Sequence, residues 1–357
     1  MIKIAINGFG RIGRQAFKIA LTKPELAVVA VNDLTEPSVL AYLLKYDSVY
    51  GVYDKMVSFE EKHEKVNPVS YSVGTLIVDG PDAAVGAGKK YPVFAEKDPA
   101  SLPWRDLDVD VVLESTGRFV TSEKASGHLR AGAKKVIISA PAKDEGLTPT
   151  FIIGVNDKDY KNQQIISNAS CTTNCITPVA AILHSKFGIK KMMMSTMHGY
   201  TAEQNLVDGP PPPLHKDLRR ARAAAVNIVP TSTGATIAAT EAIPELKGIF
   251  GGMAYRVPVA CGSVSDFTAL LNKKVTVDEV NKAFIEMSKH PMWEKVLQVT
   301  TDPIVSSDIV GSPHSAIVDL SLTQVVDGDL VKVVAWYDNE FGYANRLVEQ
   351  AILVGKL

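Results

Sequence analysis

The chain has 357 residues, 46% of them hydrophobic and 22% charged, and its formal net charge is -1. This is ordinary globular composition, and at this length two domains are the default expectation. The small net charge argues against a nucleic-acid or membrane-surface role, and no uninterrupted apolar run is long enough to span a bilayer. Three cysteines cannot build a disulfide framework, and a strand-like run starting at Ile2 leaves no room for a signal peptide. We therefore expect a cytoplasmic protein.

The first thirty-three residues have the pattern of a βαβ unit with a glycine-rich turn. Residues 2–7 predict a buried strand, and Gly8-Phe9-Gly10-Arg11-Ile12-Gly13 follows at once, before a helical pattern and a second strand over 26–31. The glycines permit a tight turn, a close approach of the backbone to a pyrophosphate and close packing of helix on sheet. Asp33 follows the second strand, where a carboxylate can accept hydrogen bonds from ribose hydroxyls. A glycine-rich turn that binds nothing is the alternative, and the complete unit favours a dinucleotide site.

Two more strand-like runs continue the alternation of strands and helices. Residues 109–114 end in Ser115-Thr116-Gly117, and residues 134–138 end in Ser139-Ala140-Pro141, with a helical pattern over 122–131 between them. Small and hydroxyl residues in these places are either ligand contacts at the sheet edge or ordinary loop formers. Residues 79–90 predict a surface loop or hairpin tip.

The stretch Ser167-Asn168-Ala169-Ser170-Cys171-Thr172-Thr173-Asn174-Cys175 opens an apolar helical pattern that stops at Gly188. Ser and Asn at this place are N-cap residues, so Cys171 is predicted at the start of a helix. Unpaired N–H groups and the macrodipole favour a thiolate there, and a thiolate is a nucleophile. The alternative is a small buried hydrophobe. Pro178 predicts a kink, or a helix that tightens only beyond it.

After Gly188, a strand-like run over 190–197 leads to His198-Gly199-Tyr200-Thr201. His198 is the best candidate for a base, although a lone histidine is more often structural. A proline-rich loop over 207–214 leads to Lys216–Arg222, where three arginines indicate either an anion site or a solvated charged turn. Thr231-Ser232-Thr233-Gly234 and Arg256 are further anion-binding features and favour the site.

The last third of the chain is rich in β-structure. Residues 260–271, 316–326 and 330–337 predict a mainly antiparallel second sheet, with a helix over 277–289. The chain ends with Asp338-Asn339-Glu340-Phe341-Gly342-Tyr343 and a helical tail over 345–354. A domain boundary near residue 170 fits this change of pattern.

Together, these motifs resemble the phosphorylating glyceraldehyde-3-phosphate dehydrogenase family from end to end. The resemblance implies an α/β protein with an N-terminal Rossmann dinucleotide-binding domain over 1–170, on which the C-terminal helix 340–357 packs back. It also implies an α+β catalytic domain over 171–339, with a mixed, largely antiparallel sheet and an S-loop at about 199–225. The implied assembly is a homotetramer.

The resemblance also assigns roles to residues. It implies Cys171 as nucleophile and His198 as its base and ion-pair partner. NAD contacts are implied for Asn7, Gly8, Gly10, Arg11, Ile12, Gly13, Asp33, Lys97, Thr116, Gly117, Ser139, Asn339 and Tyr343. Thr201, Arg220 and Arg256 are implied to hold the substrate phosphate, and Ser170, Thr172, Thr233 and Gly234 to receive inorganic phosphate. No metal site is expected.

The implied reaction is the reversible NAD-dependent oxidation and phosphorylation of glyceraldehyde 3-phosphate, through a Cys thioester, in glycolysis or gluconeogenesis. Two alternatives stay open: erythrose-4-phosphate dehydrogenase, and an inactive nucleotide-binding scaffold. Three departures from the family pattern stand out, namely an apparent insertion in the proline-rich loop, Lys97 in place of a common Arg, and Gly199 and Glu203 after the base. The first bears on the choice between NAD and NADP, for which Asp33 favours NAD because a carboxylate repels a 2′-phosphate.

Overall fold

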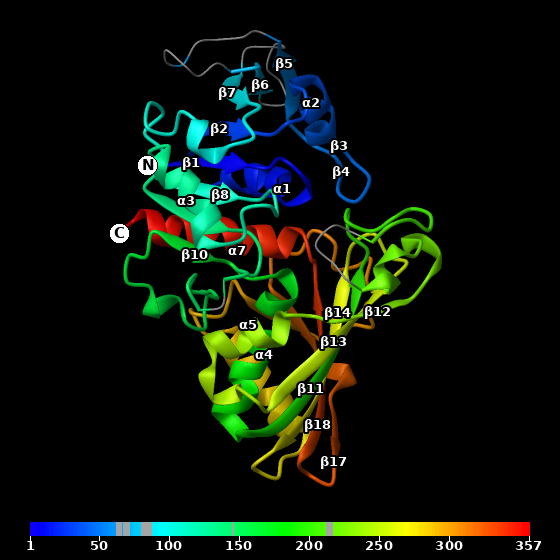
Figure 1. Ribbon diagram of the computed structural model, residues 1–357. Helices are drawn as coiled ribbons and strands as arrows, with labels where there is room; N and C mark the ends of the chain where they lie inside the picture. Colours follow the sequence, from blue (N-terminus) through cyan, green and yellow to red (C-terminus); the bar gives the residue numbers. More distant parts are fainter. Residues whose placement is uncertain (62–65, 67–71, 80–87, 145, 212–216) are drawn as a thin grey trace. The chain divides into compact units, whose positions relative to one another are not determined.

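The computed structural model describes residues 1–357 except 62–65, 67–71, 80–87, 145 and 212–216 (Figure 1). The chain folds into two compact units. The first comprises Met1–Phe151, Tyr160–Asn168 and Ala344–Leu357, and the second comprises Ile152–Asp159 and Ala169–Tyr343. The sequence analysis predicted domain boundaries near residues 170 and 340. It contained no signal that would assign the short segment Ile152–Asp159 to the second unit.

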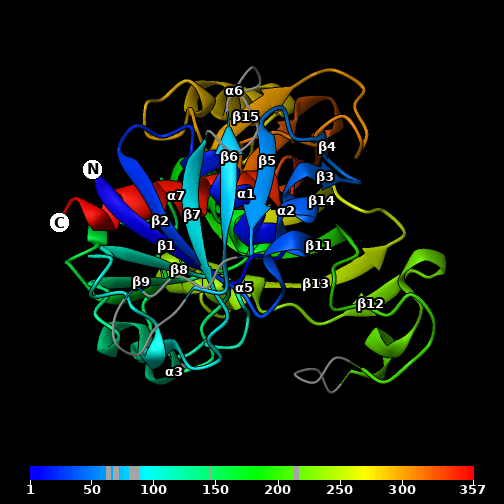
Figure 2. The ribbon, with the colours of Figure 1, turned by 90° about the horizontal axis from the view of Figure 1, so that it is seen from above.

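An eight-stranded sheet organises the first unit, in the order β10-β9-β8-β1-β2-β7-β6-β5 (Figure 2). The strands from β10 to β7 are parallel, and β5, β6 and β7 pair antiparallel at one edge. This is the predicted Rossmann arrangement, with an antiparallel extension that the sequence did not predict. Its strands are β1 (Ile2–Asn7), β2 (Leu26–Asn32), β5 (Met56–Glu60), β6 (Gly74–Asp79), β7 (Lys89–Phe94), β8 (Val111–Glu114), β9 (Lys135–Ile138) and β10 (Ile165–Ser167).

Helices and short elements complete the first unit: α1 (Arg11–Ala20), α2 (Pro37–Lys45), α3 (Ser122–Arg130), the last part of α7 (Phe341–Gly355), the hairpin of β3 (Tyr46–Asp47) and β4 (Gly51–Val52), and the 3-10 turn η1 (Pro99–Ser101). The C-terminal helix returns to this unit, as predicted. Gln350 Nε2 donates to Phe151 O at 2.7 Å, and a Cβ on Gly355 would come within 2.5 Å of Ile2. Of the predicted loop over 79–90, residues 80–87 lie outside the described residues.

A second, mixed sheet organises the second unit, in the order β12-β13-β11-β14-β18-β16-β15, with β17 paired to β18. Only β11–β13 and β15–β16 are parallel among its described pairs. The predicted strand over 316–326 is broken, because the Asp319 carboxylate accepts from Ser321 N and Oγ and closes a 3-10 turn, η6 (Leu320–Leu322). Its strands are β11 (Ile189–Gly199), β12 (Val229–Thr231), β13 (Phe250–Val257), β14 (Ser263–Leu271), β15 (Leu297–Thr300), β16 (Ala316–Asp319), β17 (Gln324–Val326) and β18 (Leu330–Tyr337).

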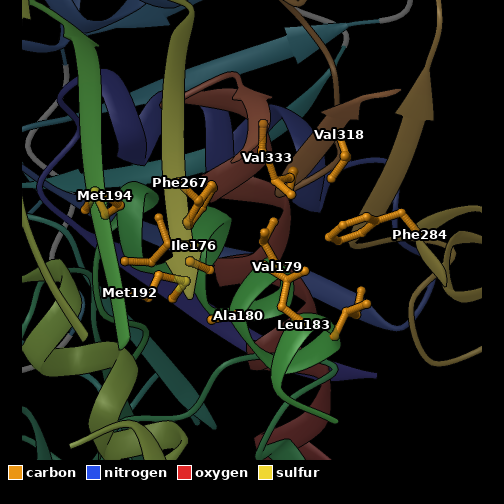
Figure 3. Packing of buried hydrophobic residues seen from close by; sticks show 14 of the residues in the cluster. Ile176, Val179, Ala180, Leu183, Met192, Met194, Phe267, Phe284, Val318 and Val333 are labelled. Atoms are coloured by element: carbon orange, nitrogen blue, oxygen red, sulfur yellow. The ribbon is translucent and has the colours of Figure 1, made fainter. Parts of the chain in front are cut away.

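The central helix of this unit, α4 (Cys171–Phe187), lies on the sheet (Figure 3). It begins at Cys171, as predicted, and continues through Pro178 as α-helix, so the alternative of a helix that tightens only beyond the proline was wrong. Ser170 caps its first turn, which makes the early start possible. The buried face of α4 packs on four strands of the sheet (Figure 3). On the helix this face consists of Ile176, Val179, Ala180 and Leu183. On the sheet its buried partners are Met192 and Met194 of β11, Phe267 of β14, Val333 of β18 and Val318 of β16.

The remaining helical elements of the second unit are α5 (Ala235–Ala242), α6 (Val277–Ser288), and the 3-10 turns η2 (Asp157–Asp159), η3 (Leu218–Ala221), η4 (Ala224–Val226) and η5 (Pro244–Leu246). Phe284 of α6 joins the same core as α4 (Figure 3). The core therefore fixes α4 against β11, and with it the two segments that carry Cys171 and His198.

Candidate active site

Cys171 and His198 lie side by side in the second unit. Cys171 is the first residue of α4, and Ser170 caps this helix by accepting a hydrogen bond from Thr173 N at 3.0 Å. His198 lies near the end of β11 rather than after it. Cys171 Sγ is 3.3 Å from His198 Nε2, within reach for a proton transfer between thiol and imidazole. The structure thus brings together the two side chains that the sequence singled out.

The backbone just before the cysteine is held in an unusual conformation. Ala169 has φ of 54°, in the left-handed region that residues with a Cβ rarely adopt. Its carbonyl accepts a hydrogen bond from the Tyr343 hydroxyl at 3.1 Å. Tyr343, predicted beside the cofactor, therefore has a structural contact that the sequence did not reveal.

The two contacts of His198 Nδ1 require opposite tautomers. Nδ1 lies 2.6 Å from Gly199 O and 2.6 Å from Arg256 Nη1. A carbonyl requires a proton on Nδ1, whereas a guanidinium only donates and requires a lone pair there. Arg256 Nη1 also has Gly199 O as an acceptor at 3.1 Å, so the proton is best placed on Nδ1. In that tautomer Nε2 presents its lone pair to the thiol, as a base must.

Both groups favour their neutral forms. Burial lowers the pKa of His198 to about 3, and the positive charge of Arg256 adds to this effect. Burial also raises the pKa of the Cys171 thiol, against the opposing effects of Arg256 and of backbone N–H groups at the helix start. The sequence predicted a thiol that ionises more easily and an ion pair with the base. In the structure burial has the larger effect, and both pKa values shift in the direction that favours a thiol and a neutral imidazole.

Arginine side chains form a positively charged cluster next to this pair. His198 and Arg256 are register partners on the parallel strands β11 and β13. Arg220 Nε donates to Thr231 Oγ1 at 2.9 Å, and its Nη1 donates to Glu203 Oε1 at 2.6 Å. The same Glu203 oxygen lies 3.4 Å from Arg256 Nη2. One carboxylate thus links two guanidinium groups.

Two buried polar atoms in this cluster have no hydrogen-bond partner among the described residues: Thr201 Oγ1 and Arg256 Nε. Buried donors of this kind are costly unless something binds them. A hydroxyl and a guanidinium are suited to a phosphate oxygen. The cluster therefore has the chemistry of an anion site.

The other two arginines of the predicted anion site do not take part. Arg219 pairs with Asp217 at 2.9 Å and Arg222 with Asp208 at 2.7 Å, and both guanidiniums are exposed. Of the two alternatives for the arginine-rich segment, an anion site or a solvated charged turn, the second therefore holds for Arg219 and Arg222. Part of the S-loop lies outside the described residues, namely Pro212, Pro213, Leu214, His215 and Lys216.

The residues predicted for inorganic phosphate start two helices of the second unit. Ser170 and Thr172 are at the start of α4, and Thr233 and Gly234 are at the start of α5. Ser170 and Thr233 are partly exposed, Gly234 is exposed, and a Cβ on Gly234 would meet nothing within 4 Å. Thr172 Oγ1 is buried and bonded to Tyr337 Oη at 3.0 Å. Tyr337, which also bonds Thr196 Oγ1 at 2.7 Å, had no signal in the sequence beyond the alternation of a strand.

The predicted glycine turn of the first unit lies between β1 and α1. Gly8 has φ of +93°, and a Cβ on Gly13 would lie 2.0 Å from Gly8 O, so both positions require glycine. Gly10 is the N-cap of α1 without a side-chain cap, and no acidic residue lies in the first turn. A Cβ on Gly10 would meet nothing within 4 Å. This open helix start, where Ile12 is partly exposed, fits a pyrophosphate bound by backbone N–H groups.

Asp33 follows β2, as predicted. Its carboxylate accepts from Phe9 N at 2.7 Å and from Thr35 N at 2.9 Å, which holds it against the glycine turn. Next to it is a cavity of about 340 Å³ lined by Leu34, Thr35, Glu36, Pro37, Glu61, Val73 and Ala95. A carboxylate beside a partly apolar cavity fits a ribose and an adenine.

The other predicted cofactor residues differ in their surroundings. Arg11 Nη1 is bound to Asp47 at 2.8 Å, which directs its guanidinium to the β3–β4 hairpin. Lys97 and Gly117 are exposed, and Thr116 and Ser139 are partly exposed after β8 and β9. Asn339 belongs to the second unit, where its Oδ1 accepts from Gly262 N at 3.1 Å and Ser263 Oγ at 2.9 Å.

Comparison with known proteins gives matches over both parts of the chain. Residues 2–122 match the NAD binding domain of glyceraldehyde 3-phosphate dehydrogenase, and residues 170–339 match its C-terminal domain. The chain belongs to the glyceraldehyde-3-phosphate dehydrogenase family. It is thus a member of a family of NAD-dependent oxidoreductases, and the first unit carries that family's NAD-binding domain.

Relatives with this family name are similar over nearly the whole chain. The glyceraldehyde-3-phosphate dehydrogenase of Mycobacterium bovis is 51% identical over 362 residues, covering 99% of both chains. Those of Mycobacterium leprae and Geobacillus stearothermophilus are 50% and 49% identical, covering 99% of this chain and 99% and 98% of their own.

Two further observations concern the described part of the chain. No helix in it combines the length and the apolar character needed to cross a membrane. Among the same residues, no group of three or more His, Cys, Asp or Glu side chains is arranged to hold a metal ion. None of the three cysteines is in a disulfide, and Cys175 and Cys261 are buried.

Proposed function

We propose that this protein oxidises glyceraldehyde 3-phosphate with NAD and phosphorylates it with inorganic phosphate, reversibly, to 1,3-bisphosphoglycerate. The observation that carries the proposal is the 3.3 Å contact between Cys171 Sγ and His198 Nε2, beside the guanidinium of Arg256. A thiol, a base with its lone pair on the correct nitrogen and an anion site together make up what acyl transfer from a phosphorylated aldehyde needs.

In the first step Cys171 Sγ attacks the aldehyde carbon, and its proton passes to His198 Nε2. A C–S bond forms, the carbonyl π bond breaks, and the oxygen becomes the alkoxide of a hemithioacetal. The Cys171 N–H, at the start of α4, and the protonated imidazole are donors that stabilise this oxygen. The side-chain cluster of Thr201, Arg220 and Arg256 holds the C3 phosphate, supported by the unpartnered Thr201 Oγ1 and Arg256 Nε.

The anion site and the base are coupled electrostatically. The positive charge of Arg256, which Glu203 compensates only in part, lowers the pKa of His198 in addition to burial. A phosphate bound at Arg256 compensates that charge and so raises the pKa of the imidazole. The base therefore becomes stronger when the substrate binds. This coupling favours proton transfer from the thiol with substrate in place and keeps the free thiol protonated.

NAD supplies the acceptor for the hydride that leaves the hemithioacetal carbon. The residues proposed to hold the cofactor directly are Asn7, Gly8, Gly10, Ile12, Gly13, Asp33, Thr116, Gly117, Ser139 and Asn339. Arg11 and Lys97 are proposed to contribute backbone or peripheral contacts. Tyr343 is proposed to act through its hydrogen bond to the Ala169 segment. The resulting Cys171 thioester is attacked by phosphate at Ser170, Thr172, Thr233 and Gly234. The C–O bond forms, the C–S bond breaks, and the sulfur leaves to be reprotonated.

Erythrose-4-phosphate dehydrogenase remains the enzymatic alternative, with the same thiol and base. The relatives at about half identity all carry the glyceraldehyde-3-phosphate name, which supports the first choice. The test is kcat/KM for both sugar phosphates with NAD and phosphate, and with NADP in place of NAD. We expect a higher efficiency with glyceraldehyde 3-phosphate and with NAD. A higher kcat/KM with erythrose 4-phosphate would overturn the proposed substrate. Equal kcat/KM values with NADP and with NAD would overturn the role given to Asp33.

The inactive scaffold is tested through the nucleophile. In Cys171→Ser we expect normal folding and NAD binding, with turnover lower by roughly four orders of magnitude or more, because a hydroxyl at the same place is a far weaker nucleophile. Cys175→Ser is the matched control, since this buried thiol lies one helical turn away and is expected to keep turnover within a fewfold of the wild type. Substantial turnover in Cys171→Ser would mean that another group is the nucleophile.

The assembly and location are proposed with the function. A cytoplasmic homotetramer is supported by three cysteines that form no disulfide and by large apolar side chains exposed on the second unit. These are Met193, Leu206, Val207, Leu218, Val226, Ile228 and Ile237, all more than 60% exposed. So many exposed large apolar side chains are unusual for a monomer. They are typical of a surface that another subunit covers in the assembly.

A further inference from the structure

A buried carboxylate lies at the end of β8, in the first unit. Glu114 is 1% exposed, and none of the roles above uses it. Its Oε1 accepts from Thr116 N at 2.9 Å and pairs with Thr116 Oγ1 at 2.5 Å. Its Oε2 is 2.5 Å from Asn7 Nδ2 and 3.0 Å from His128 Nε2. Hydrogen bonds from three residues thus converge on one carboxylate that water does not reach.

One chain of hydrogen bonds fixes the amide of Asn7. The backbone N–H of Glu96 can only donate, and it does so to Asn32 Oδ1 at 2.9 Å. Asn32 must therefore turn its amide nitrogen to Asn7 Oδ1, at 2.7 Å. That in turn directs the Asn7 amide N–H at Glu114 Oε2. The orientation of both amides follows from a single obligatory donor.

A second chain fixes the imidazole. The indole Nε1–H of Trp104 can only donate, and it lies 2.9 Å from His128 Nδ1. Nδ1 must accept, so His128 is neutral and carries its proton on Nε2. That proton points at Glu114 Oε2. His128 and Trp104 are both fully buried, so neither solvent nor a cation compensates the carboxylate from this side.

The carboxylate lies at the sheet edge where the proposed cofactor residues gather. Asn7 pairs with Glu114 across β1 and β8, and with Asn32 across β1 and β2. Gly8 and Asp33 follow the ends of β1 and β2 directly, and Thr116 lies two residues after the end of β8. In open α/β sheets, ligands bind beyond the carboxyl ends of the strands. Glu114 therefore supports the backbone and side chains that are proposed to meet NAD.

We propose that Glu114 is a positioning residue that also sets the balance of affinity between the two redox forms of the cofactor. It holds Asn7 and Thr116 in place through hydrogen bonds, and it places a carboxylate at the cofactor edge. The oxidised cofactor has a cationic nicotinamide and the reduced one does not, so the two forms differ by one unit of charge. A buried carboxylate near them disfavours the more negative, reduced form. The inference rests on the NAD site proposed above.

The test measures Kd for NAD⁺ and for NADH by calorimetry on the full chain, for the wild type and for Glu114→Gln. We expect the ratio of Kd for NADH to Kd for NAD⁺ to fall about fivefold in Glu114→Gln, since the charge is removed and the shape is kept. An altered fold alone would weaken the binding of NAD⁺ and of NADH equally and leave the ratio of the two Kd values unchanged. A ratio unchanged within twofold would overturn the proposal, whereas a wild type that binds neither form would overturn the NAD site itself.

Asp110→Asn is the matched control. Asp110 precedes the other end of β8, where its carboxylate accepts from Lys3 N at 2.8 Å and Lys134 Nζ at 2.7 Å. Removing the Asp110 charge is expected to leave the ratio of the two Kd values unchanged. A fall in this ratio as large as that in Glu114→Gln would show that the place of the charge in the unit does not matter, and it would overturn the proposal. Should Glu114→Gln not fold, Trp104→Phe tests the positioning. In a variant whose circular dichroism and unfolding transition match the wild type, we expect a several-fold loss of affinity for both forms, and unchanged affinities would overturn the positioning role.

Discussion

At the scale of single residues, the electrostatics of the site are set by burial more than by the helix start. Cys171 lies where helical N–H groups favour a thiolate, yet burial raises the pKa of its thiol. His198 lies beside Arg256 and is buried, and both effects lower the pKa of its imidazole. Each group alone therefore prefers its neutral form. Charge separation between them is favoured by a compensating anion, the role proposed for the substrate phosphate.

The low pKa of His198 predicts a loss of stability in acid. The folded-state pKa is about 3, below the ordinary value of 6.5, so between these values the unfolded chain binds a proton that the folded chain does not. The contribution is present above pH 6.5 and is lost as the pH falls from there towards 3. At pH 5 one such group lowers the free energy of unfolding by about 2 kcal/mol relative to pH 7.

This prediction is measured by urea unfolding at pH 7.5 and pH 5 in the wild type and in His198→Asn. We expect the wild type to lose about 2 kcal/mol more than the variant on acidification. His184→Asn, a partly exposed histidine of α4, is the control and should follow the wild type. Equal losses in the wild type and His198→Asn would contradict the neutral, buried imidazole.

At the scale of elements, α4 joins the core of the second unit to the nucleophile. Its buried side chains hold the helix on the sheet, and its first residue is Cys171. Leu183 lies twelve residues after the cysteine, about 18 Å along the helix. Stability and reactivity are thus carried by different ends of one element.

Leu183→Ala is expected to lower the free energy of unfolding by about 2–5 kcal/mol, because it leaves a cavity in a fully buried core. Below the unfolding transition, kcat should stay within a fewfold of the wild type. The measurement combines urea unfolding with steady-state kinetics. Lys186→Ala, on the exposed side of the same turn, should change stability by less than about 0.5 kcal/mol. A large loss of kcat in Leu183→Ala at full folding would show that the two ends of α4 are coupled.

The elements also show how far a sequence predicts this site. Local signals sufficed for Ser170 as helix cap, for Cys171 as the first helical residue and for the glycine turn, because each depends on neighbours along the chain. The contact of His198 with Arg256 joins residues 58 positions apart and depends on the pairing of β11 with β13, which periodicity does not reveal. The same holds for Tyr337 and for Glu203, whose partners come from other elements. The burial that governs both pKa shifts is likewise a property of the packed core.

At the scale of the whole molecule, large apolar side chains of the second unit are exposed in the isolated chain. Leu218 is 73% and Val226 77% exposed, on the short turns η3 and η4, and η3 packs on β12 and η4 on β13. Neighbouring elements therefore present large apolar groups to solvent in the isolated chain. Burying such groups is favourable by about 25 cal/mol per Å². Contact between copies of the chain accounts for this exposure better than a monomer does.

We therefore expect a tetramer of four 38.5-kDa chains in solution, and its loss in Val226→Glu. A glutamate placed in a subunit contact would have to be desolvated without a partner, which outweighs the modest energy of one apolar contact. Sedimentation equilibrium measures the mass, and circular dichroism checks that the smaller species is folded. Val39→Glu, at a 43%-exposed position of α2 in the first unit, makes the same chemical change elsewhere and should leave the mass unchanged. A wild-type mass of one chain would refute the assembly, whereas a tetrameric Val226→Glu would place the subunit contacts away from η4.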